Sequence, residues 1–170
     1  MTAADLVVTP MGLRFLGRVL PCTIGRSGIT AAKREGDGAT PAGTHRIVGM
    51  LYRPDRVAAT ALPRWAVPIG PFDLWCDDPE SSDYNRMVRA PFAAGHERLR
   101  RADPVYDLAI LTDWNWPVAE RGRGSAIFIH AWRRPGAPTA GCVALSRHDL
   151  FWIARRLHPR SRLIVPCPTS

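Results

Sequence analysis

A histidine and a cysteine twelve positions apart are the residues of this sequence that could carry nucleophilic chemistry. His130 ends the nearly apolar run 125–130, and Cys142 directly follows Gly141. The thiolate of a cysteine is a strong nucleophile, and a neighbouring imidazole can produce it by taking the thiol proton. A buried cysteine can equally be a small core residue, and a buried histidine a satisfied one. The pair by itself leaves catalysis and a structural role open.

The elements around the pair would have to hold both side chains in place. Residues 125–130 predict a buried strand with His130 at its end. The loop 131–140 can return the chain toward the end of that strand. Gly141 allows close approach of the backbone, so the amides around Cys142 could face the oxyanion of a reaction intermediate.

One helix is expected after the cysteine. Ser146 and Asp149 have the spacing of a capping box. An apolar stripe follows at helical spacing, formed by Leu150, Ile153, Ala154 and Leu157. Pro159 would stop this helix.

The rest of the sequence predicts short strands joined by turns, because 16 prolines and 14 glycines are spread along the chain. The expected strands are residues 6–9, 13–15, 19–24, 44–50, 65–69, 106–112, 125–130 and 162–166. The polar segment 77–103 is expected to be an insertion, partly helical around 96–101. Residues 1–170 would then form a single, mainly β domain: a mixed β-sandwich or partly closed barrel with one helix in its C-terminal region.

The charge of the chain limits its partners without choosing one. The net charge is +8, and Lys33 is the only lysine. A basic surface suits nucleic acid, anionic lipid or an acidic polymer such as a cell wall. No apolar stretch of signal-peptide length is visible in residues 1–24, and none elsewhere is long enough to span a bilayer. We therefore expect no membrane insertion.

The cysteines argue against a metal centre. Cys22, Cys76, Cys142 and Cys167 are widely spaced and include no C-x-x-C pair. A zinc site needs clustered ligands, so we expect no metal. A disulfide among the three cysteines other than Cys142 stays open.

Several motifs occur in a fixed order between residues 22 and 150. IFIH at 127–130 precedes TAGCV at 139–143, and KREGDGATPAGTHRI lies far upstream at 33–47. A third stretch starts on Tyr106 and ends on Asn115. Together these motifs resemble the L,D-transpeptidase catalytic domain, the YkuD-like family. DP at 78–79, YNR at 84–86 and GSAI at 124–127 resemble its compact single-domain bacterial members.

The resemblance implies a cysteine acyltransferase that needs no cofactor. Cys142 would attack the carbonyl of an L-to-D peptide bond in a peptidoglycan stem peptide, and His130 would take the thiol proton. The amides of Gly141 and Cys142 would hold the oxyanion, and the carbonyl of Ala131 would orient the imidazole. The thioester would pass to an amine of a second stem in a 3-3 or 1-3 cross-link. The family's cysteine is also acylated by carbapenems.

Other residues would then contact the substrate: Thr139, Ala140, Ala131, Trp132, Arg133, Tyr84, Asn85, Arg86, Asn115 and His96. The family often has polar residues where this chain has Ala140 and Ala144. Recognition of the donor peptide would therefore be built differently here, with Arg133, Arg134, Arg86 or His96 as possible substitutes.

Two alternatives stay open beside transpeptidation. With water as the acceptor, the same chemistry would make an L,D-carboxypeptidase or amidase. The net charge would also suit a non-catalytic module that binds an anionic polymer or nucleic acid, although no recognition motif for nucleic acid is visible. The leading interpretation predicts a monomer that binds no nucleic acid and acts in the periplasm or cell wall, where its inferred substrate lies.

Overall fold

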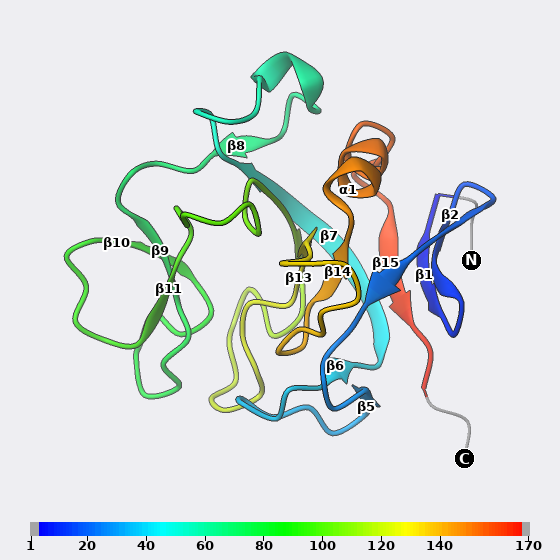
Figure 1. Cartoon of the computed structure of the whole chain (residues 1–170). Helices are drawn as coiled ribbons and strands as arrows, with labels where there is room; N and C mark the ends of the chain where they lie inside the picture. The colour runs from blue at the N-terminus through cyan, green and yellow to red at the C-terminus, as the bar shows by residue number, and fades with distance from the viewer. Residues whose placement is uncertain (1–3, 168–170) are drawn as a thin grey trace.

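The computed structural model describes residues 4–167 and is mainly β (Figure 1). The 3-10 helix η1 spans Ala59–Ala61, and the α-helix α1 spans Arg147–Ala154. The strands are β1 (Leu6–Thr9), β2 (Gly12–Phe15), β3 (Arg18–Leu20), β4 (Cys22–Thr23), β5 (Ile29–Thr30), β6 (Thr40–Pro41), β7 (Gly43–Tyr52), β8 (Val67–Pro68), β9 (Asp73–Cys76), β10 (Met87–Arg89), β11 (His96–Arg98), β12 (Leu108–Thr112), β13 (Phe128–Ala131), β14 (Val143–Leu145) and β15 (Arg162–Val165).

The main sheet curls into a nearly closed barrel. Its ten strands follow the order β3-β2-β1-β15-β7-β12-β13-β14-β4, with β8 added beside β7. The two ends of this order, β3 and β4, are consecutive in sequence and separated only by Pro21. The edges of the sheet must therefore lie close together. Parallel pairs (β1 with β15, β13 with β14) occur beside antiparallel ones. The predicted mixed, partly closed β architecture is confirmed.

Two hydrophobic clusters lie on opposite faces of the strands that carry the site. Ile129 and Val143, which are paired across β13 and β14, belong to the larger cluster. Phe128 and Cys142 belong to the second cluster. Side chains alternate between the two faces of a strand, so Cys142 lies on the face opposite to the larger cluster.

The predicted helix is present as α1. The side chain of Ser146 accepts the amide of Asp149, as a capping box requires. The apolar stripe packs into the larger cluster, and Leu157 joins it from beyond the helix. The helix ends at Ala154, before the predicted stop at Pro159, because the Arg156 amide bonds to the carbonyl three residues back and tightens the last turn.

The small sheet β10-β9-β11 corrects the prediction of a helix around 96–101. His96 and Arg98 of β11 are exposed, whereas Glu97 and Leu99 turn inward. This alternation has the period of a strand, and β11 pairs antiparallel with β9. In Figure 1 this sheet lies on the side of the molecule away from the N-terminal hairpin β1–β2.

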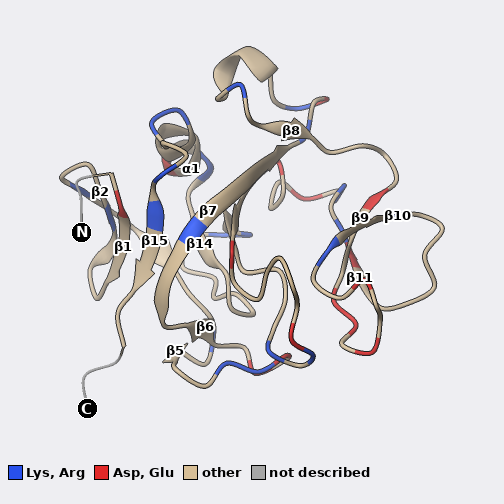
Figure 2. Cartoon of the chain, turned by 180° about the vertical axis from the view of Figure 1, so that it is seen from behind, with Lys and Arg blue, Asp and Glu red and all other residues tan. Residues whose placement is uncertain are grey.

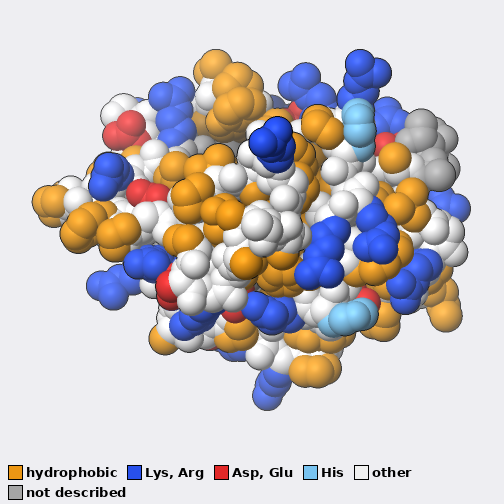
Figure 3. Space-filling model, turned by 90° about the horizontal axis from the view of Figure 1, so that it is seen from above, with side chains coloured by type: hydrophobic (Ala, Val, Ile, Leu, Met, Phe, Trp, Pro, Cys, Tyr) orange, Lys and Arg blue, Asp and Glu red, His pale blue; other side chains and the backbone are white. Residues whose placement is uncertain are grey.

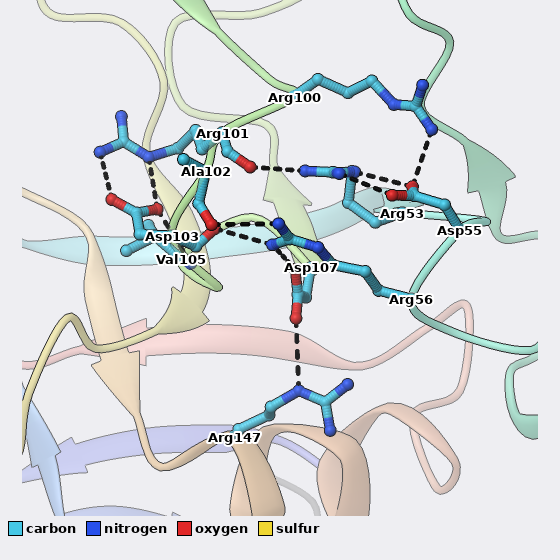
Figure 4. A network of polar contacts seen from close by, with 10 residues as sticks. All are labelled: Arg53, Asp55, Arg56, Arg100, Arg101, Ala102, Asp103, Val105, Asp107 and Arg147. Atoms are coloured by element: carbon cyan, nitrogen blue, oxygen red, sulfur yellow. Dashed lines mark hydrogen bonds and ion pairs between the residues drawn. The ribbon is translucent and has the colours of Figure 1, made fainter.

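An arginine–aspartate network holds residues 100–107, the segment that leads into β12 (Figure 4). Arg56 donates to the carboxylate of Asp107 at 2.9 Å and to the Ala102 carbonyl at 3.0 Å. Arg147 of α1 reaches the other oxygen of Asp107 at 3.4 Å. The side chain of Asp107 is 6% exposed, so these contacts join two loops and the helix through a buried carboxylate.

The basic residues do not gather into one patch. Figure 2 shows them on several strands and loops, and the face in Figure 3 mixes them with hydrophobic and neutral side chains. Several arginines are paired with acids, for example Arg162 with Asp5 and Arg46 with Asp113. None of the described helices is long and apolar enough to cross a membrane. All four cysteines are free thiols, so the open question of a disulfide is answered.

Candidate active site

The parallel pairing of β13 with β14 brings the histidine and the cysteine together. Ile129 lies opposite Val143, and His130 lies opposite Ala144. Cys142 immediately precedes β14 and is therefore level with Phe128. Residues at the same level or two positions apart share a face, so Cys142 and His130 are diagonal neighbours on one face of the sheet.

The backbone of the neighbouring residue orients His130. Its Nδ1 lies 2.8 Å from the Ala131 carbonyl oxygen, the contact expected from the family resemblance. A carbonyl only accepts hydrogen bonds, so Nδ1 carries the proton and Nε2 keeps a free lone pair. Burial lowers the pKa of His130 to about 4, despite the opposing contact with Ala131. The ring of Tyr106 packs edge-on against the imidazole, with 5.4 Å between ring centroids. The His130 imidazole is thus neutral at neutral pH, and its orientation is fixed by the Ala131 carbonyl.

The thiol of Cys142 is buried and protonated in this structure. Its Sγ donates to the Ala126 carbonyl at 3.0 Å and accepts the Phe128 amide at 3.4 Å. The residue is 9% exposed. Burial raises the pKa of Cys142 to about 12, although the Phe128 amide acts in the opposite direction. Among residues 4–167, the hydrogen bonds of Sγ go to these two backbone groups and not to His130.

Gly141 occupies a position that only glycine can fill. Its φ is +145°, and a Cβ there would lie 2.8 Å from the Ala39 carbonyl oxygen. The Gly141 carbonyl accepts the hydroxyl of the buried Thr40 at 2.8 Å. That hydroxyl in turn accepts the Gly25 amide at 2.8 Å. The upstream motif 33–47 therefore packs against and hydrogen-bonds the residue that precedes Cys142.

Thr139 fixes the other side of the same turn. Its hydroxyl donates to the Cys142 carbonyl at 2.7 Å and accepts the Gly141 amide at 3.1 Å. Its backbone bonds to Ile24 and Arg26. The Gly141 amide, expected to face the oxyanion, is therefore engaged by Thr139 in this structure. Ala140 is exposed beside it.

Asn85 organises the backbone around the thiol. Its Oδ1 accepts the Ala126 amide at 3.0 Å and the Trp75 indole at 3.2 Å. Its Nδ2 donates to the carbonyls of Asn115 and Trp114 at 2.8 and 3.1 Å. Ala126, whose carbonyl accepts the thiol, has a φ of +51°, a conformation uncommon for alanine. Asn85 thus holds the backbone of Ala126, whose carbonyl accepts the Cys142 thiol, and its polar atoms are hydrogen-bonded to protein groups.

Tyr84 and Asn115 are also engaged within the protein. The Tyr84 hydroxyl donates to Glu35 and accepts the Gly124 amide at 3.0 Å. The side chain of Asn115 accepts the Glu120 amide at 2.7 Å and donates to the Gly124 carbonyl at 3.0 Å. Both residues are buried. Their side chains hold the segment ahead of β13 through these hydrogen bonds, and their predicted contact with the substrate stays a prediction.

The remaining predicted substrate residues lie nearer the surface. Trp132 is half-buried after β13, and Arg133 is exposed in the loop that follows. His96 is exposed on β11, with Nδ1 2.7 Å from the Ala94 carbonyl oxygen. Arg86 lines a cavity of about 200 Å³ together with Trp116 and other side chains. These four residues do not form one cluster with Cys142.

Some residues around the site were not predicted as functional. Glu97 of β11 accepts the Tyr106 hydroxyl at 2.6 Å. It therefore helps to fix the tyrosine ring that packs against His130. Lys33 reaches the back of Gly141. The available signal for Lys33 was its position as the only lysine, at the start of the upstream motif. Among the described residues, no group of three or more His, Cys, Asp or Glu side chains is placed to hold a metal ion.

Comparison with known proteins agrees with the motifs and the fold. The model of the L,D-transpeptidase catalytic domain, YkuD, matches residues 13–165, nearly the whole chain. No curated protein matches the sequence. The matched span contains every strand and side chain that builds the site around Cys142 and His130. The chain therefore belongs to the L,D-transpeptidase catalytic-domain family.

Proposed function

We propose that this protein is a peptidoglycan L,D-transpeptidase in which Cys142 is the nucleophile and His130 the base. Family membership supports a role on peptidoglycan stem peptides. The observation that carries the assignment of roles is the contact between His130 Nδ1 and the Ala131 carbonyl. This contact leaves Nε2 as the proton acceptor beside the strand that follows Cys142.

The acylation half-reaction begins with a movement of the thiol. In the resting structure Sγ donates to Ala126, and catalytic hydrogen bonds commonly tighten only when substrate is bound. The thiol would turn toward Nε2 of His130, give up its proton, and attack the carbonyl carbon of the L-to-D bond. The tetrahedral intermediate would then collapse as His130 gives the proton to the departing amine, leaving a thioester on Cys142.

The second half-reaction uses the same base. Nε2 of His130 takes a proton from the amine of a second stem peptide, and the amine attacks the thioester carbonyl. Collapse of this intermediate forms the cross-link and returns the proton to the Cys142 sulfur. Water in place of the amine would release a shortened stem. The proposed site of action is therefore the cell wall, and the proposed working unit is a monomer.

Purified muropeptides test this function. The protein would be incubated with disaccharide-tetrapeptide and disaccharide-pentapeptide monomers, and the products separated and weighed by mass spectrometry. Cross-linked dimers support transpeptidation, whereas shortened monomers alone support hydrolysis. Cys142→Ala should make neither product. Full activity in this variant, with Cys76→Ala as the matched control in another buried cysteine, would rule out the proposed nucleophile.

Exposure to a carbapenem gives an independent test. An acyl adduct mapped to the peptide that contains Cys142 would show that this thiol forms a thioester-type bond. His130→Asn should slow the formation of the adduct, because the base that removes the thiol proton is lost. An adduct on Cys22 or Cys167 with an unmodified Cys142 would contradict the assignment.

A further inference from the structure

Lys33 places a buried ammonium group beside the site. Its side chain is only 3% exposed. The Nζ group donates to the carboxylate of Asp37 and, at 2.9 Å, to the Arg34 carbonyl. A lysine is rarely so buried unless it is paired, and burying a charge is costly. The fold therefore holds a positive charge at this place.

The stem of Lys33 passes between the two segments that hold the nucleophile. Its Cε lies 3.0 Å from the position of a Cβ built on Gly124, and its Nζ lies 3.6 Å from that of a Cβ built on Gly141. Gly141 directly precedes Cys142, and Gly124 lies two residues before Ala126, the acceptor of the thiol. A side chain at Gly124 would crowd the lysine stem, whereas the distance at Gly141 is that of ordinary van der Waals contact. The chain thus keeps room for an ammonium directly behind the nucleophile's turn.

The hydrogen-bond partners of the Lys33 ammonium accept two of its three N–H groups. An ammonium has three donors, and the described contacts use two of them. The carboxylate of Asp37 also accepts the amides of Arg34 and Ala39, at 2.7 and 2.8 Å. Its negative charge is therefore shared among several donors. Burial opposes its ionisation, yet the bonds from Lys33 and these amides keep the pKa of Asp37 below its usual value.

The other ionisable groups that face Cys142 do not supply a positive charge in the resting state. His130 on β13 is neutral at neutral pH. Glu97 on β11 raises the pKa of Cys142, whereas Lys33 lowers it. Tyr106, ahead of β12, has a pKa raised well above its usual value, first by burial and then by Glu97. Lys33 is therefore the cation that favours an anion at this sulfur.

We propose that the Lys33 ammonium, held by Asp37 behind Gly141, stabilises the negative charge that forms at Cys142 and on the oxyanion of the tetrahedral intermediates. Lys33 acts through space and touches no reacting atom, so it is a positioning residue. The oxyanion part rests on the proposed function. A fixed positive charge in a water-poor site needs no reorganisation when the anion appears, which is why such charges contribute strongly to catalysis.

The test is the pH dependence of thiol alkylation, which needs no peptidoglycan. Iodoacetamide would be reacted with the whole protein across a pH series, and the rate followed by mass spectrometry on the peptide containing Cys142. In Lys33→Met, which keeps the stem and removes the charge, alkylation at neutral pH should be about tenfold slower. This corresponds to a rise of about one pH unit in the midpoint of thiol ionisation, extrapolated from the rates below it. Arg34→Met is the matched control, because it removes an exposed charge from the same segment and should leave the midpoint in place.

A second variant separates the charge from a structural role. Asp37→Asn keeps the ammonium and removes its counter-charge, so the midpoint should move down. If the Lys33–Asp37 ion pair served only to hold the structure, breaking it from either side would have the same effect. Lys33→Met and Asp37→Asn would then shift the midpoint of Cys142 ionisation in the same direction. An unchanged midpoint in Lys33→Met, or an upward shift in Asp37→Asn, would overturn the inference. If Lys33→Met does not fold, the sign in Asp37→Asn decides alone.

The outcome is independent of the enzyme assay. Opposite shifts in the two variants support the charge on Lys33 even if no muropeptide dimer forms. Dimers made by a protein whose alkylation midpoint does not respond to Lys33→Met would support the proposed function and reject the role of Lys33.

Discussion

The hydroxyl of Thr40 donates a hydrogen bond to the carbonyl of Gly141 at 2.8 Å, across 101 positions of sequence. Thr40 is fully buried, and its oxygen also accepts the Gly25 amide. One side chain thus ties three segments together directly before Cys142. The positive φ of Gly141 is maintained from this side by Thr40 and from the other by Thr139.

Thr40→Val should destabilise the protein and slow the chemistry of Cys142. Valine has nearly the same shape but leaves the Gly25 amide and the Gly141 carbonyl without their partner, at a cost of about 1–3 kcal/mol. Urea unfolding measures this loss, and iodoacetamide alkylation measures the effect on the thiol. Thr40→Ser keeps the hydroxyl and should lose much less. Equal losses in the two variants would show that the methyl group, and not the hydrogen bond, matters.

Gly141→Ala should cost about 3 kcal/mol or more of unfolding free energy. Its φ of +145° is nearly exclusive to glycine, and the new Cβ would lie 2.8 Å from the Ala39 carbonyl oxygen. Gly136→Ala is the matched control, because Gly136 also has a positive φ of +76° but has no atom within 4 Å of its Cβ position. That variant should lose about 1 kcal/mol through backbone strain alone. Similar losses at both positions would contradict the proposed close contact.

The free energy of unfolding should decrease as the pH is lowered from about 6.5 to 4, because His130 is buried in its neutral form. Burial lowers the pKa of folded His130 from 6.5 to about 4, so within this window the unfolded chain binds the proton more readily. The contribution is complete above about pH 6.5 and is lost as the pH falls through the folded value, by about 3 kcal/mol in total. Urea unfolding at several pH values should show this slope, and His130→Asn should reduce it to the part that comes from other groups such as His45, whose pKa is also lowered by burial.

The control for this pH effect is His148, whose side chain is 84% exposed. His148→Asn should keep the slope of the parent protein. A slope that persists undiminished in His130→Asn would assign the pH dependence to other groups.

Asp107→Asn should destabilise the loops next to Tyr106. The buried carboxylate of Asp107 binds Arg56 and Arg147, and charge-assisted bonds of this kind contribute about 1.5–3 kcal/mol. Unfolding in urea checks the loss. Glu80→Gln removes one partner of the exposed pair with Arg121 and should change stability by less than about 0.5 kcal/mol. A loss at Glu80 as large as that at Asp107 would show that burial of the network is unimportant.

Sequence patterns predict those strands and helices that are determined by neighbouring residues along the chain. The predicted strand 125–130 is present as β13, which starts later, at Phe128, and continues to Ala131, and the capping box at Ser146 starts α1. The predicted strand 19–24 is divided into β3 and β4 by Pro21, whose missing N–H interrupts a ladder. The segment 96–101 was mistaken for a helix because the pairing partner that makes it a strand, β9, lies about twenty residues away in sequence.

The sequence allows candidate site residues to be named, but it does not show which groups their side chains contact. Spacing and family motifs predict Cys142 and His130 as the catalytic pair, but the relative placement of the two side chains depends on the parallel register of β13 and β14. The side chains of Asn85 and Asn115, which we predict to contact the substrate, bind backbone groups in this structure. A polar residue in a motif can serve the substrate or the turn that carries the nucleophile, and only its hydrogen-bond partners distinguish the two.

The position of β15 in the sheet has a consequence for how the protein matures. This strand lies between β1 and β7, with Leu163 opposite both Leu6 and His45. The N-terminal hairpin therefore lacks its hydrogen-bonded partner strand in the main sheet until residues 162–165 have been synthesised. Chains shorter than this would contain the cysteine, the histidine and the upstream motif but no complete sheet to hold them in register. Because burial in the folded protein raises the pKa of the Cys142 thiol, we expect this thiol to react more readily with alkylating compounds in the incomplete chain than after the last strand is inserted.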